Sequence, residues 1–345
     1  MVVSPFTTKL NFGQKHRSGR NVVKKLLVGA TFIMSACLST AMVSNASAQL
    51  VGIGTSPQGT LTYQIGASVS KVMQDVGKIP SRVQPQSGTS TIIPLLNSGE
   101  LDISFANTAE VYDAFHGVGT FPKQPNPKLR MMAVIFPIKA GLFVRANSDI
   151  KSIKDMKGKR IVYGLASQEI VRKTVDAMLA TGGLSIKDLT PVLAPNVVRG
   201  ADDLAAGRVD IAVFAIGAPK VAEVDAAVGG IRFIPIDNSP TALAALKKDF
   251  PTGYIAQIKP APNLVGVKEP MFTMFYDYAA IAGADVPAAR IKAITQIIAE
   301  NRDALAQGQP LFRQMETARL FTNFNVPYHP GSIAYYKEKG IAETK

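Results

Sequence analysis

One pattern occurs twice in this chain, first in Asn97-Ser98-Gly99-Glu100-Leu101-Asp102-Ile103 and again in Ala205-Ala206-Gly207-Arg208-Val209-Asp210-Ile211. Each copy runs from small residues through a glycine to a charged residue, an apolar residue, an aspartate and a second apolar residue. A glycine at this point is typical of a helix end, after which the apolar residues begin a strand. The same helix-to-strand connection in each half of the chain predicts two similar α/β lobes.

Short apolar runs alternate with amphipathic stretches along most of the chain. The predicted strands are residues 51–54, 103–106, 131–136, 141–145, 160–163, 211–214 and 231–236. The predicted helices are residues 61–76, 168–179, 202–206, 220–227 and 241–250, the last with Ser239 as its cap and Pro240 as its first residue. This alternation favours an α/β fold with mostly parallel sheets. From Pro287 to Gly340 we expect mostly helix, with Pro287 and Pro310 opening successive helices.

The first 48 residues have the composition of an export leader. Six basic residues precede an apolar run at 26–43, and Ala46-Ser47-Ala48 supplies the small side chains that signal peptidase requires. We expect a signal peptide over residues 1–48 and a periplasmic mature protein. Two alternatives stay open: a lipid anchor on Cys37, although Met34 stands where a branched aliphatic residue is usual, and a retained anchor, although small and polar residues dilute the run.

The distribution of basic residues along the sequence argues against a nucleic-acid partner. The chain has 38 Lys and Arg against 25 Asp and Glu, and without the six basic residues of the leader 32 remain, for a net charge of +7. That charge is compatible with an anionic ligand, whereas no run of Arg and Lys interleaved with aromatic residues is present. Cys37 is the one cysteine, so the mature chain cannot form a disulfide. A chain of roughly 300 residues can bury a sufficient core without one, and we expect a monomer.

The residue patterns of catalytic sites are missing from the sequence. Of the three histidines, His16 belongs to the leader, and His116 and His329 are far apart with no acid-rich cluster near either. A metal site or a histidine-based triad is therefore not expected. The stretch Gly54-Thr55-Ser56-Pro57-Gln58-Gly59-Thr60 has the glycine spacing of a phosphate loop, but Thr60 stands where the lysine belongs. We expect a protein that is not an enzyme and needs no cofactor.

Neutral polar residues and glycines recur where the predicted strands end. They are Thr55, Ser56, Gly59 and Thr60 after strand 51–54, Asn107 and Thr108 after 103–106, Ser167 and Gln168 after 160–163, and Gly217 after 211–214. Ligands of open α/β sheets bind beyond the carboxyl ends of strands, where helix starts present free N–H groups. For any single residue a helix cap is an equally good explanation. Their recurrence favours a site for a carboxylate with little formal positive charge.

Seven motifs follow one another over nearly the whole mature chain. They are residues 54–60, Ser87-Gly88-Thr89, residues 97–108, 153–160 and 207–212, Val326-Pro327-Tyr328-His329-Pro330-Gly331, and Tyr335-Tyr336-Lys337-Glu338-Lys339-Gly340. In this order they resemble the TAXI-type solute receptors of tripartite ATP-independent periplasmic (TRAP) transporters. The last two motifs are the most distinctive, whereas the stretch at 153–160 is common among type II periplasmic binding proteins.

The resemblance implies the type II periplasmic binding protein fold, with two α/β lobes, a hinge and a ligand cleft between the lobes. Lobe 1 would comprise residues 49–140 plus 270–345 and lobe 2 residues 141–269, with the chain crossing near 140–145 and 266–273. Relatives bind glutamate, glutamine and other small carboxylates. By the same resemblance the ligand-facing residues would be Thr55, Ser56, Thr60, Thr89, Asn107, Thr108 and Phe136.

Two cations are candidate partners for a carboxylate. Lys139 and Arg199 lie near the expected hinge and a strand-to-helix turn. For each of them, a solvent-exposed charge is the alternative explanation. The turn Ala166-Ser167-Gln168-Glu169-Ile170 departs from the Gly-Ser-Gly-Thr turn of many relatives, which suggests a ligand other than glutamate.

Together these patterns predict an extracytoplasmic solute receptor. We expect it to capture a small carboxylate, such as an amino acid, a dicarboxylate or a related organic acid, and to deliver it to a membrane permease for gradient-driven uptake. Three alternatives stay open: the binding protein of an ATP-driven transporter, the solute-sensing partner of a membrane sensor kinase, and a periplasmic hydrolase. The sequence does not identify the solute.

Overall fold

The strands carry much of the buried core of the chain. The computed structural model describes residues 50–344, so the predictions about the leader, including Cys37, lie outside the described residues. The strands are β1 (Val51–Thr55), β2 (Ser81–Pro85), β3 (Ile103–Asn107), β4 (Leu129–Arg145), β5 (Arg160–Gly164), β6 (Thr190–Ala194), β7 (Ala212–Ala215), β8 (Ile231–Phe233), β9 (Tyr254–Ile258) and β10 (Met271–Gly283). One sheet has the order β2-β1-β3-β10-β4-β7, with β8 also on β4 and β9 also on β10, and β5 and β6 form a second sheet.

The helices follow the strands in most of the chain and succeed one another at its end. They are α1 (Leu61–Asp75), α2 (Thr89–Ser98), α3 (Thr108–His116), α4 (Glu169–Thr181), α5 (Val197–Ala205), α6 (Pro219–Val228), α7 (Pro240–Asp249), α8 (Ala288–Glu300), α9 (Arg302–Gly308) and α10 (Pro330–Lys339). Short 3₁₀ turns occur at Lys154–Met156, Ile186–Asp188, Pro310–Gln314 and Thr317–Arg319. Within residues 50–344 none of the helices has the length and apolar character needed to cross a bilayer.

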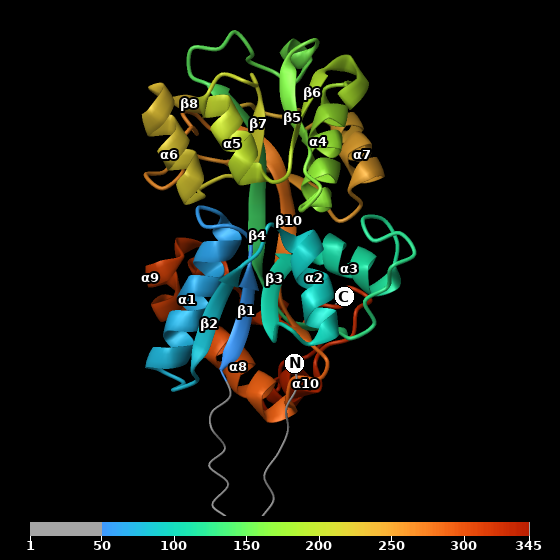
Figure 1. Cartoon of the computed structure of the whole chain (residues 1–345), viewed down its shortest axis with the longest axis vertical. Helices are drawn as coiled ribbons and strands as arrows, with labels where there is room; N and C mark the ends of the chain where they lie inside the picture. Colours follow the sequence, from blue (N-terminus) through green and yellow to red (C-terminus); the bar gives the residue numbers. More distant parts are fainter. Residues whose placement is uncertain (1–49, 345) are drawn as a thin grey trace, which may run out of the picture. The chain divides into compact units, whose positions relative to one another are not determined.

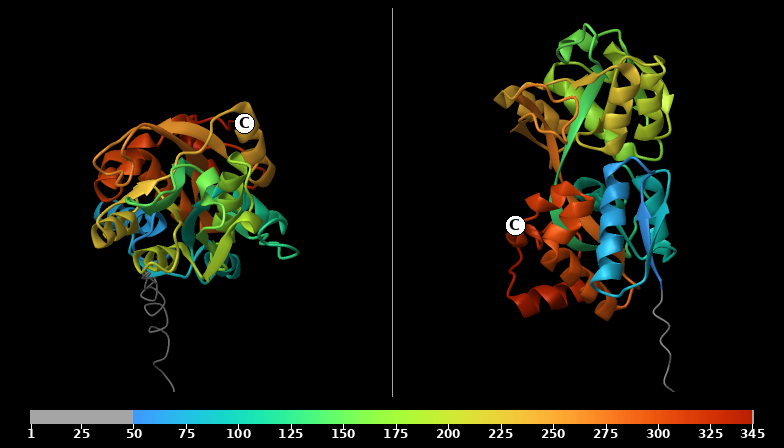
Figure 2. Two further views of the ribbon diagram at one scale, coloured as in Figure 1. Left: turned by 90° about the horizontal axis from the view of Figure 1, so that it is seen from above. Right: turned by 90° about the vertical axis from the view of Figure 1, so that its left-hand side faces the viewer.

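Two long strands, β4 and β10, connect two groups of elements (Figure 1). β4 pairs with β10 from Leu129 to Ala140 and with β7 and β8 from Ala140 to Arg145. β10 in turn pairs with β9 where it begins and with β3 where it ends. We call β1–β3, α1–α3 and α8–α10 the lower group and β5–β9 with α4–α7 the upper group, as Figure 1 draws them, and Figure 2 shows both from two other directions.

The α/β class is confirmed, but the expectation of mostly parallel sheets is wrong. β1 pairs in parallel with β2 and β3, and β5 with β6. Every pair of named strands that includes β4 or β10 is antiparallel. The reason is that the chain passes once from the lower to the upper group in β4 and once back in β10, so the two strands run in opposite directions side by side. The sequence patterns did not reveal β10, nor β2, β6 and β9.

The predicted strands 131–136 and 141–145 form one strand, β4. A proline removes an N–H from the ladder and usually marks a bulge or an edge, which favours two shorter strands. Pro137 lies opposite Asp277 of β10, and the register shifts close by, between Tyr278 and Ala279. Nearly every residue of β4 is buried, so packing on both faces keeps the strand continuous across the irregularity.

Other boundaries differ by a few residues from the predictions. The strand expected at 231–236 ends at Phe233, and the helix expected at 202–206 begins at Val197. Pro287 precedes α8 as its cap, and Pro310 opens a 3₁₀ turn. Ser239 is confirmed as the cap of α7, because its Oγ accepts a hydrogen bond from the N–H of Ala242.

The repeated pattern is confirmed as a helix-to-strand connection in both copies. Gly99 ends α2 with φ of 83°, and Gly207 follows α5 with φ of 71°. The aspartate of each copy then holds a neighbouring strand: Oδ2 of Asp102 accepts from the N–H of Gly52 in β1 at 2.6 Å, and Oδ2 of Asp210 from the N–H of Arg160 in β5 at 2.9 Å. The pattern therefore performs the same structural task in both groups.

We expect Asp102→Ala to lower the free energy of unfolding by roughly 1–3 kcal/mol, because it removes a charge-assisted hydrogen bond and leaves the N–H of Gly52 unpaired. Denaturant unfolding measures the change. Glu100→Ala is the control, since Glu100 is an exposed acid of the same connection. Equal stability of the two variants would contradict the role of Asp102.

Candidate ligand-binding site

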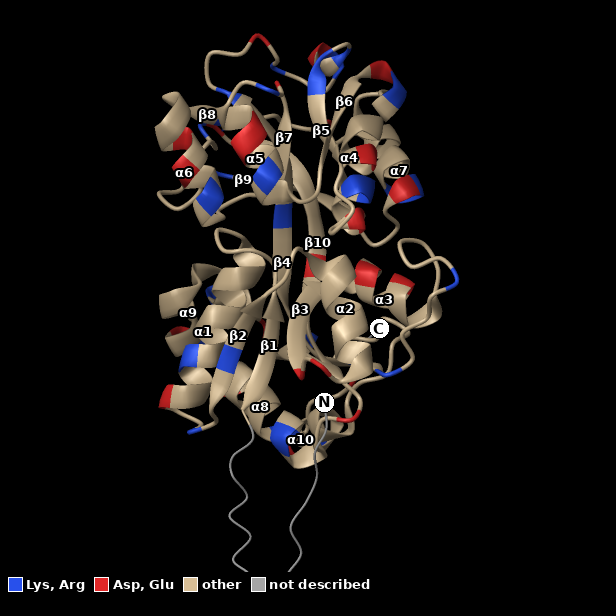
Figure 3. Cartoon of the chain, viewed as in Figure 1, with Lys and Arg blue, Asp and Glu red and all other residues tan. Residues whose placement is uncertain are grey.

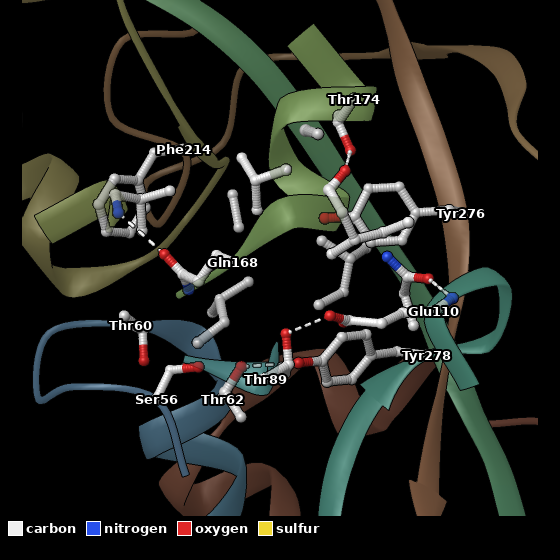
Figure 4. A pocket seen from close by; sticks show the side chains of 18 of the residues that line it. Ser56, Thr60, Thr62, Thr89, Glu110, Gln168, Thr174, Phe214, Tyr276 and Tyr278 are labelled. Atoms are coloured by element: carbon white, nitrogen blue, oxygen red, sulfur yellow. Dashed lines mark hydrogen bonds between the residues drawn. The ribbon is translucent and has the colours of Figure 1, made fainter. Parts of the chain in front are cut away.

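A cavity lies between the lower and upper groups, beside β4 and β10 (Figure 4). The volume of the cavity that is open to the centres of water molecules is ≈ 70 Å³. One water needs roughly 10–15 Å³ on this measure, so the cavity suits a small solute. Its lining consists of Ser56, Thr60, Leu61, Thr62, Thr89, Asn107, Glu110, Ile138, Ala140, Gln168, Ile170, Val171, Thr174, Val197, Val213, Phe214, Ala215, Tyr276 and Tyr278.

Five helices begin at this cavity, because residues from the starts of α1, α2, α3, α4 and α5 all line it. The first turns of α1, α3 and α5 have side-chain caps from Thr60, Asn107 and Asn196, whereas α2 and α4 have none. The starts of helices carry partial positive charge and unpaired N–H groups. The cavity is therefore surrounded by a favourable environment for an anion although its lining contains no basic side chain among the described residues.

Two polar atoms of the lining have no hydrogen-bond partner among the described residues. The hydroxyl of Ser56 and Oε2 of Glu110 are buried, and neither has a hydrogen bond within residues 50–344. Both side chains are 1% exposed. A buried polar atom without a partner costs stability, so a ligand that bonds to it recovers that cost.

Glu110 lies in the first turn of α3 and is the only acidic residue that lines the cavity among the described residues. The hydroxyl of Thr89 donates to its Oε1 at 2.8 Å. Burial raises the pKa of Glu110 to about 8, against the opposing effect of the Thr89 hydrogen bond, and the nearby Asp113 and Glu169 raise it further. At neutral pH the carboxyl group is therefore mainly protonated.

Two tyrosines of β10 complete the polar lining. The hydroxyl of Tyr278 is paired with the hydroxyl of Thr62 at 2.7 Å and donates to the carbonyl oxygen of Phe105 at 3.1 Å. Burial raises the pKa of Tyr276 and of Tyr278 above the ordinary value, so both stay neutral. Figure 3 shows β1 and β3 without charged residues, in contrast to several helices of the upper group. The lining of the cavity thus combines apolar side chains with neutral polar ones, and Glu110 is its one ionisable acid among the described residues.

Five of the residues predicted from the sequence line this cavity: Ser56, Thr60, Thr89, Asn107 and Gln168. Thr60 and Asn107 are also helix caps, accepting from the N–H groups of Tyr63 and Glu110. Oε1 of Gln168 accepts from the N–H of Val197 at 2.9 Å, which joins the starts of α4 and α5. The structure brings these five side chains together from both groups, as Figure 4 shows for four of them.

Three further predicted residues lie where the two groups meet, outside the cavity lining. The carbonyl oxygen of Gly59 accepts from the N–H of Lys220 at 3.1 Å. The carbonyl oxygen of Ser167 accepts from the N–H of Ser90 at 3.2 Å. Gly217 lines a separate hollow that includes Leu311.

Thr55, Thr108 and Phe136 are buried away from the lining. The hydroxyl of Thr55 is buried without a partner among the described residues. The hydroxyl of Thr108 donates to the carbonyl oxygen of Asp277 at 3.4 Å. Phe136 packs edge-on against Phe312, with 5.1 Å between ring centroids.

The two candidate cations do not line the cavity either. Nζ of Lys139 donates to Oε1 of Gln314 at 3.2 Å and lies 5.7 Å from the centroid of the Phe275 ring. Burial lowers the pKa of Lys139. Arg199 is an exposed residue whose Nε lies 3.2 Å from Oδ1 of Asp203.

The sequence patterns missed Glu110 and the two tyrosines. Glu110 follows Asn107 by three residues, a spacing typical of a capping box, in which the acid would turn back to the helix start. In the structure its carboxyl group instead bonds to Thr89 of α2. Tyr276 and Tyr278 lie on β10, a strand that the patterns did not reveal. Within the part of the chain that the structure describes, no cluster of His, Cys, Asp and Glu could hold a metal ion.

Comparison with solved structures shows the fold of this chain in a known protein. PhnD1 from Prochlorococcus marinus, solved in complex with methylphosphonate, matches 86% of this chain and 100% of its own length, with a TM-score of 0.53 and 11% identity. The alkanesulfonate-binding protein SsuA from Xanthomonas axonopodis pv. citri matches 85% of this chain and 80% of its own, with a TM-score of 0.45 and 15% identity. At this identity the likeness to PhnD1 shows a shared fold alone.

A family model gives the more direct assignment. The model described as the NMT1-like family matches residues 53–340. This range includes every described helix and every described strand, except for the first two residues of β1. The match covers both groups of elements and the whole cavity lining. The chain belongs to the NMT1-like family.

Proposed function

We propose that this protein is an extracytoplasmic solute receptor that captures a small carboxylate in the cavity between its two groups of elements. It delivers the solute, as a monomer, to the permease of a TRAP-type transporter. The observation that carries the proposal is a small cavity at five helix starts, with a buried hydroxyl of Ser56 that has no partner among the described residues. Membership of the NMT1-like family and the fold shared with PhnD1, which was solved in complex with methylphosphonate, support it.

The two groups act in this proposal as lobes that close over the solute. Lobe 1 comprises residues 49–140 plus 270–345, and lobe 2 comprises residues 141–269. The change of pairing partners along β4 at Ala140 supports a hinge at that point, and the hydrogen bonds from Ser90 to Ser167 and from Lys220 to Gly59 would hold the closed form. A solute that contacts both lobes shifts the population toward closure by its extra contacts.

A thermal-shift screen tests the proposal. The full chain is expressed with its own leader, and the exported protein is screened against carboxylates, amino acids, phosphonates, sugars and metal cations. A ligand that binds only the folded state raises the melting temperature by mass action, so we expect the largest shift from a carboxylate. Shifts from sugars or cations alone would contradict the anion site. A processed N-terminus at Gln49 would support the signal peptide.

Ser56→Ala separates binding from stability. We expect its free energy of unfolding to equal that of the unaltered protein or to exceed it by up to roughly 1–2 kcal/mol. The reason is that the variant removes a buried hydroxyl that has no partner within residues 50–344. Its affinity for the carboxylate should fall about tenfold, which corresponds to ~1.4 kcal/mol. Calorimetry and denaturant unfolding measure the two effects.

Ser68→Ala is the matched control for this prediction. Ser68 is also buried, but its hydroxyl donates to the carbonyl oxygen of Leu305 at 2.7 Å, away from the cavity. This variant should lose stability and keep its affinity. The opposite pattern, with Ser68→Ala impaired in binding and Ser56→Ala unaffected, would place the solute elsewhere.

The type of transporter is tested by uptake into proteoliposomes that contain the receptor and its permease. A TRAP-type system accumulates the solute when an ion gradient is imposed and needs no ATP. Uptake that requires ATP would instead support the receptor of an ATP-driven transporter. Binding of a solute that supports no uptake would favour the sensor alternative.

A further inference from the structure

The carboxyl group of Glu110 is held at the cavity by one hydrogen bond and leaves one oxygen free to meet a solute. Thr89 donates to Oε1 at 2.8 Å, and Oε2 is buried without a partner among the described residues. Since the hydroxyl of Thr89 uses its proton on Oε1, a proton carried by the carboxyl group belongs on Oε2. Figure 4 shows the side chain between Thr89 and Tyr276, at the wall of the cavity.

The groups around Glu110 do not neutralise a negative charge on it. From its own helix Asp113 faces it, and from α4 Glu169 and Lys173 do so. Lys173 is committed to Asp113, with Nζ 2.8 Å from Oδ2. β10 contributes only the neutral hydroxyls of Tyr276 and Tyr278. An ionised Glu110 would therefore oppose an anion in the cavity, whereas a protonated one would attract it.

We propose that Glu110 binds the solute as a neutral carboxylic acid, with Oε2 donating its hydrogen bond to an anionic oxygen of the solute. This inference rests on the proposed receptor function and deepens it. The proton stays on Glu110, and no covalent bond changes. A hydrogen bond from a hydroxyl to an anionic oxygen is short and strong, so it can replace a basic side chain, of which the described residues supply none to this lining.

The proposal restricts the class of solute. A solute group that contacts Oε2 has to accept a hydrogen bond from its O–H. A carboxylate oxygen can accept this bond, whereas an ammonium group cannot. The best solute is then a small organic monoacid whose carboxylate faces α3. Solute binding should also be coupled to proton uptake, because the complex holds the proton of Glu110 more tightly than the empty receptor does.

Affinity as a function of pH tests the proposal. The probes are acetate, lactate, pyruvate and propionate, and the one with the largest thermal shift is taken into calorimetry between pH 6 and pH 9.5 with the exported protein. We expect a constant Kd up to about pH 7 and a rise above pH 8 that approaches tenfold per pH unit, because Glu110 ionises in the empty receptor with a pKa of about 8. Calorimetry at pH 8.5 in two buffers of different ionisation enthalpy should show proton uptake on binding.

Glu110→Gln is the decisive variant. Its amide keeps a hydrogen-bond donor of the same shape but cannot titrate, so its Kd should be weaker by about threefold to tenfold at pH 6 and should no longer depend on pH. Glu100→Gln, an exposed acid away from the cavity, should keep both the affinity and the pH profile of the unaltered protein.

Two results would overturn the inference while leaving a receptor function in place. Affinity that increases from pH 7 to pH 9 in the unaltered protein, and not in Glu110→Gln, would show that the solute binds to the receptor with Glu110 ionised and not neutral. A pH profile that Glu110→Gln does not alter would remove Glu110 from solute binding. Failure of every carboxylate to bind at both pH 6 and pH 9 would instead overturn the proposed function, and the inference with it.

Discussion

Replacing Glu110 with glutamine is expected to stabilise the protein at high pH by up to about 5 kcal/mol and to change its stability little at pH 4. The folded-state pKa of Glu110 is raised from 4.5 to about 8 by burial, and each pH unit of such a shift corresponds to ~1.36 kcal/mol. Between these two values the folded chain holds a proton that the unfolded chain has lost. The stability of the unaltered protein therefore falls as pH rises through this window, and glutamine removes the fall.

Denaturant unfolding of both proteins at pH 4, 6, 8 and 9 measures this effect as the difference between their free energies of unfolding. The contributions of other titrating groups cancel in this difference. Glu100→Gln is the control, since Glu100 is exposed and should give a difference close to zero throughout. If the difference in free energy of unfolding between Glu110→Gln and the unaltered protein stays constant from pH 4 to pH 9, the carboxyl group of Glu110 has an ordinary pKa. Added monocarboxylate at pH 8 should reduce the difference, because the solute binds the protonated form.

Gly88→Ala is expected to weaken solute binding by roughly tenfold to a hundredfold. A Cβ at Gly88 would lie 2.7 Å from the carbonyl carbon of Ser167 and would also overlap the oxygen of that carbonyl group and the Cγ of Gln168. Gly88 belongs to the turn before α2 in the lower group, and Ser167 and Gln168 precede α4 in the upper group. Overlap with backbone atoms cannot be relieved by a rotamer change, and the cost of such overpacking is about 1–3 kcal/mol.

Gly88→Ala should destabilise the closed form and leave the folding of each lobe unchanged. Calorimetry measures the affinity, and small-angle X-ray scattering shows whether the radius of gyration still decreases on addition of solute. Ser87→Ala is the matched control, because Ser87 is an exposed residue of the same turn whose hydroxyl bonds only to Thr91 in the described contacts. Unchanged affinity in Gly88→Ala would mean that the contact between the turn and Ser167 is not part of the solute-bound state.

Much of the local structure could be predicted because its causes lie within a few residues. Ser239 and Pro240 open α7 as expected, since a cap and its N–H partner are three residues apart. The two copies of the glycine and aspartate pattern form the same connection for the same reason. Five residues of the candidate site were also found in this way, because strand ends and helix starts are visible in the sequence and meet at the same edge of a sheet.

The sequence alone predicted the α/β class, the approximate bounds of α1, α4, α6 and α7, and five of the polar residues that line the cavity. Packing between distant segments determines that β4 and β10 run antiparallel between the two groups, and that Glu110, Tyr276 and Tyr278 line the cavity. Thr62 and Tyr278, for example, share a hydrogen bond although 216 positions separate them in the sequence. No local spacing pattern can predict a contact between residues so far apart along the chain. The protonation of Glu110 is decided in the same way, because its pKa depends on burial, which arises when distant segments pack around it.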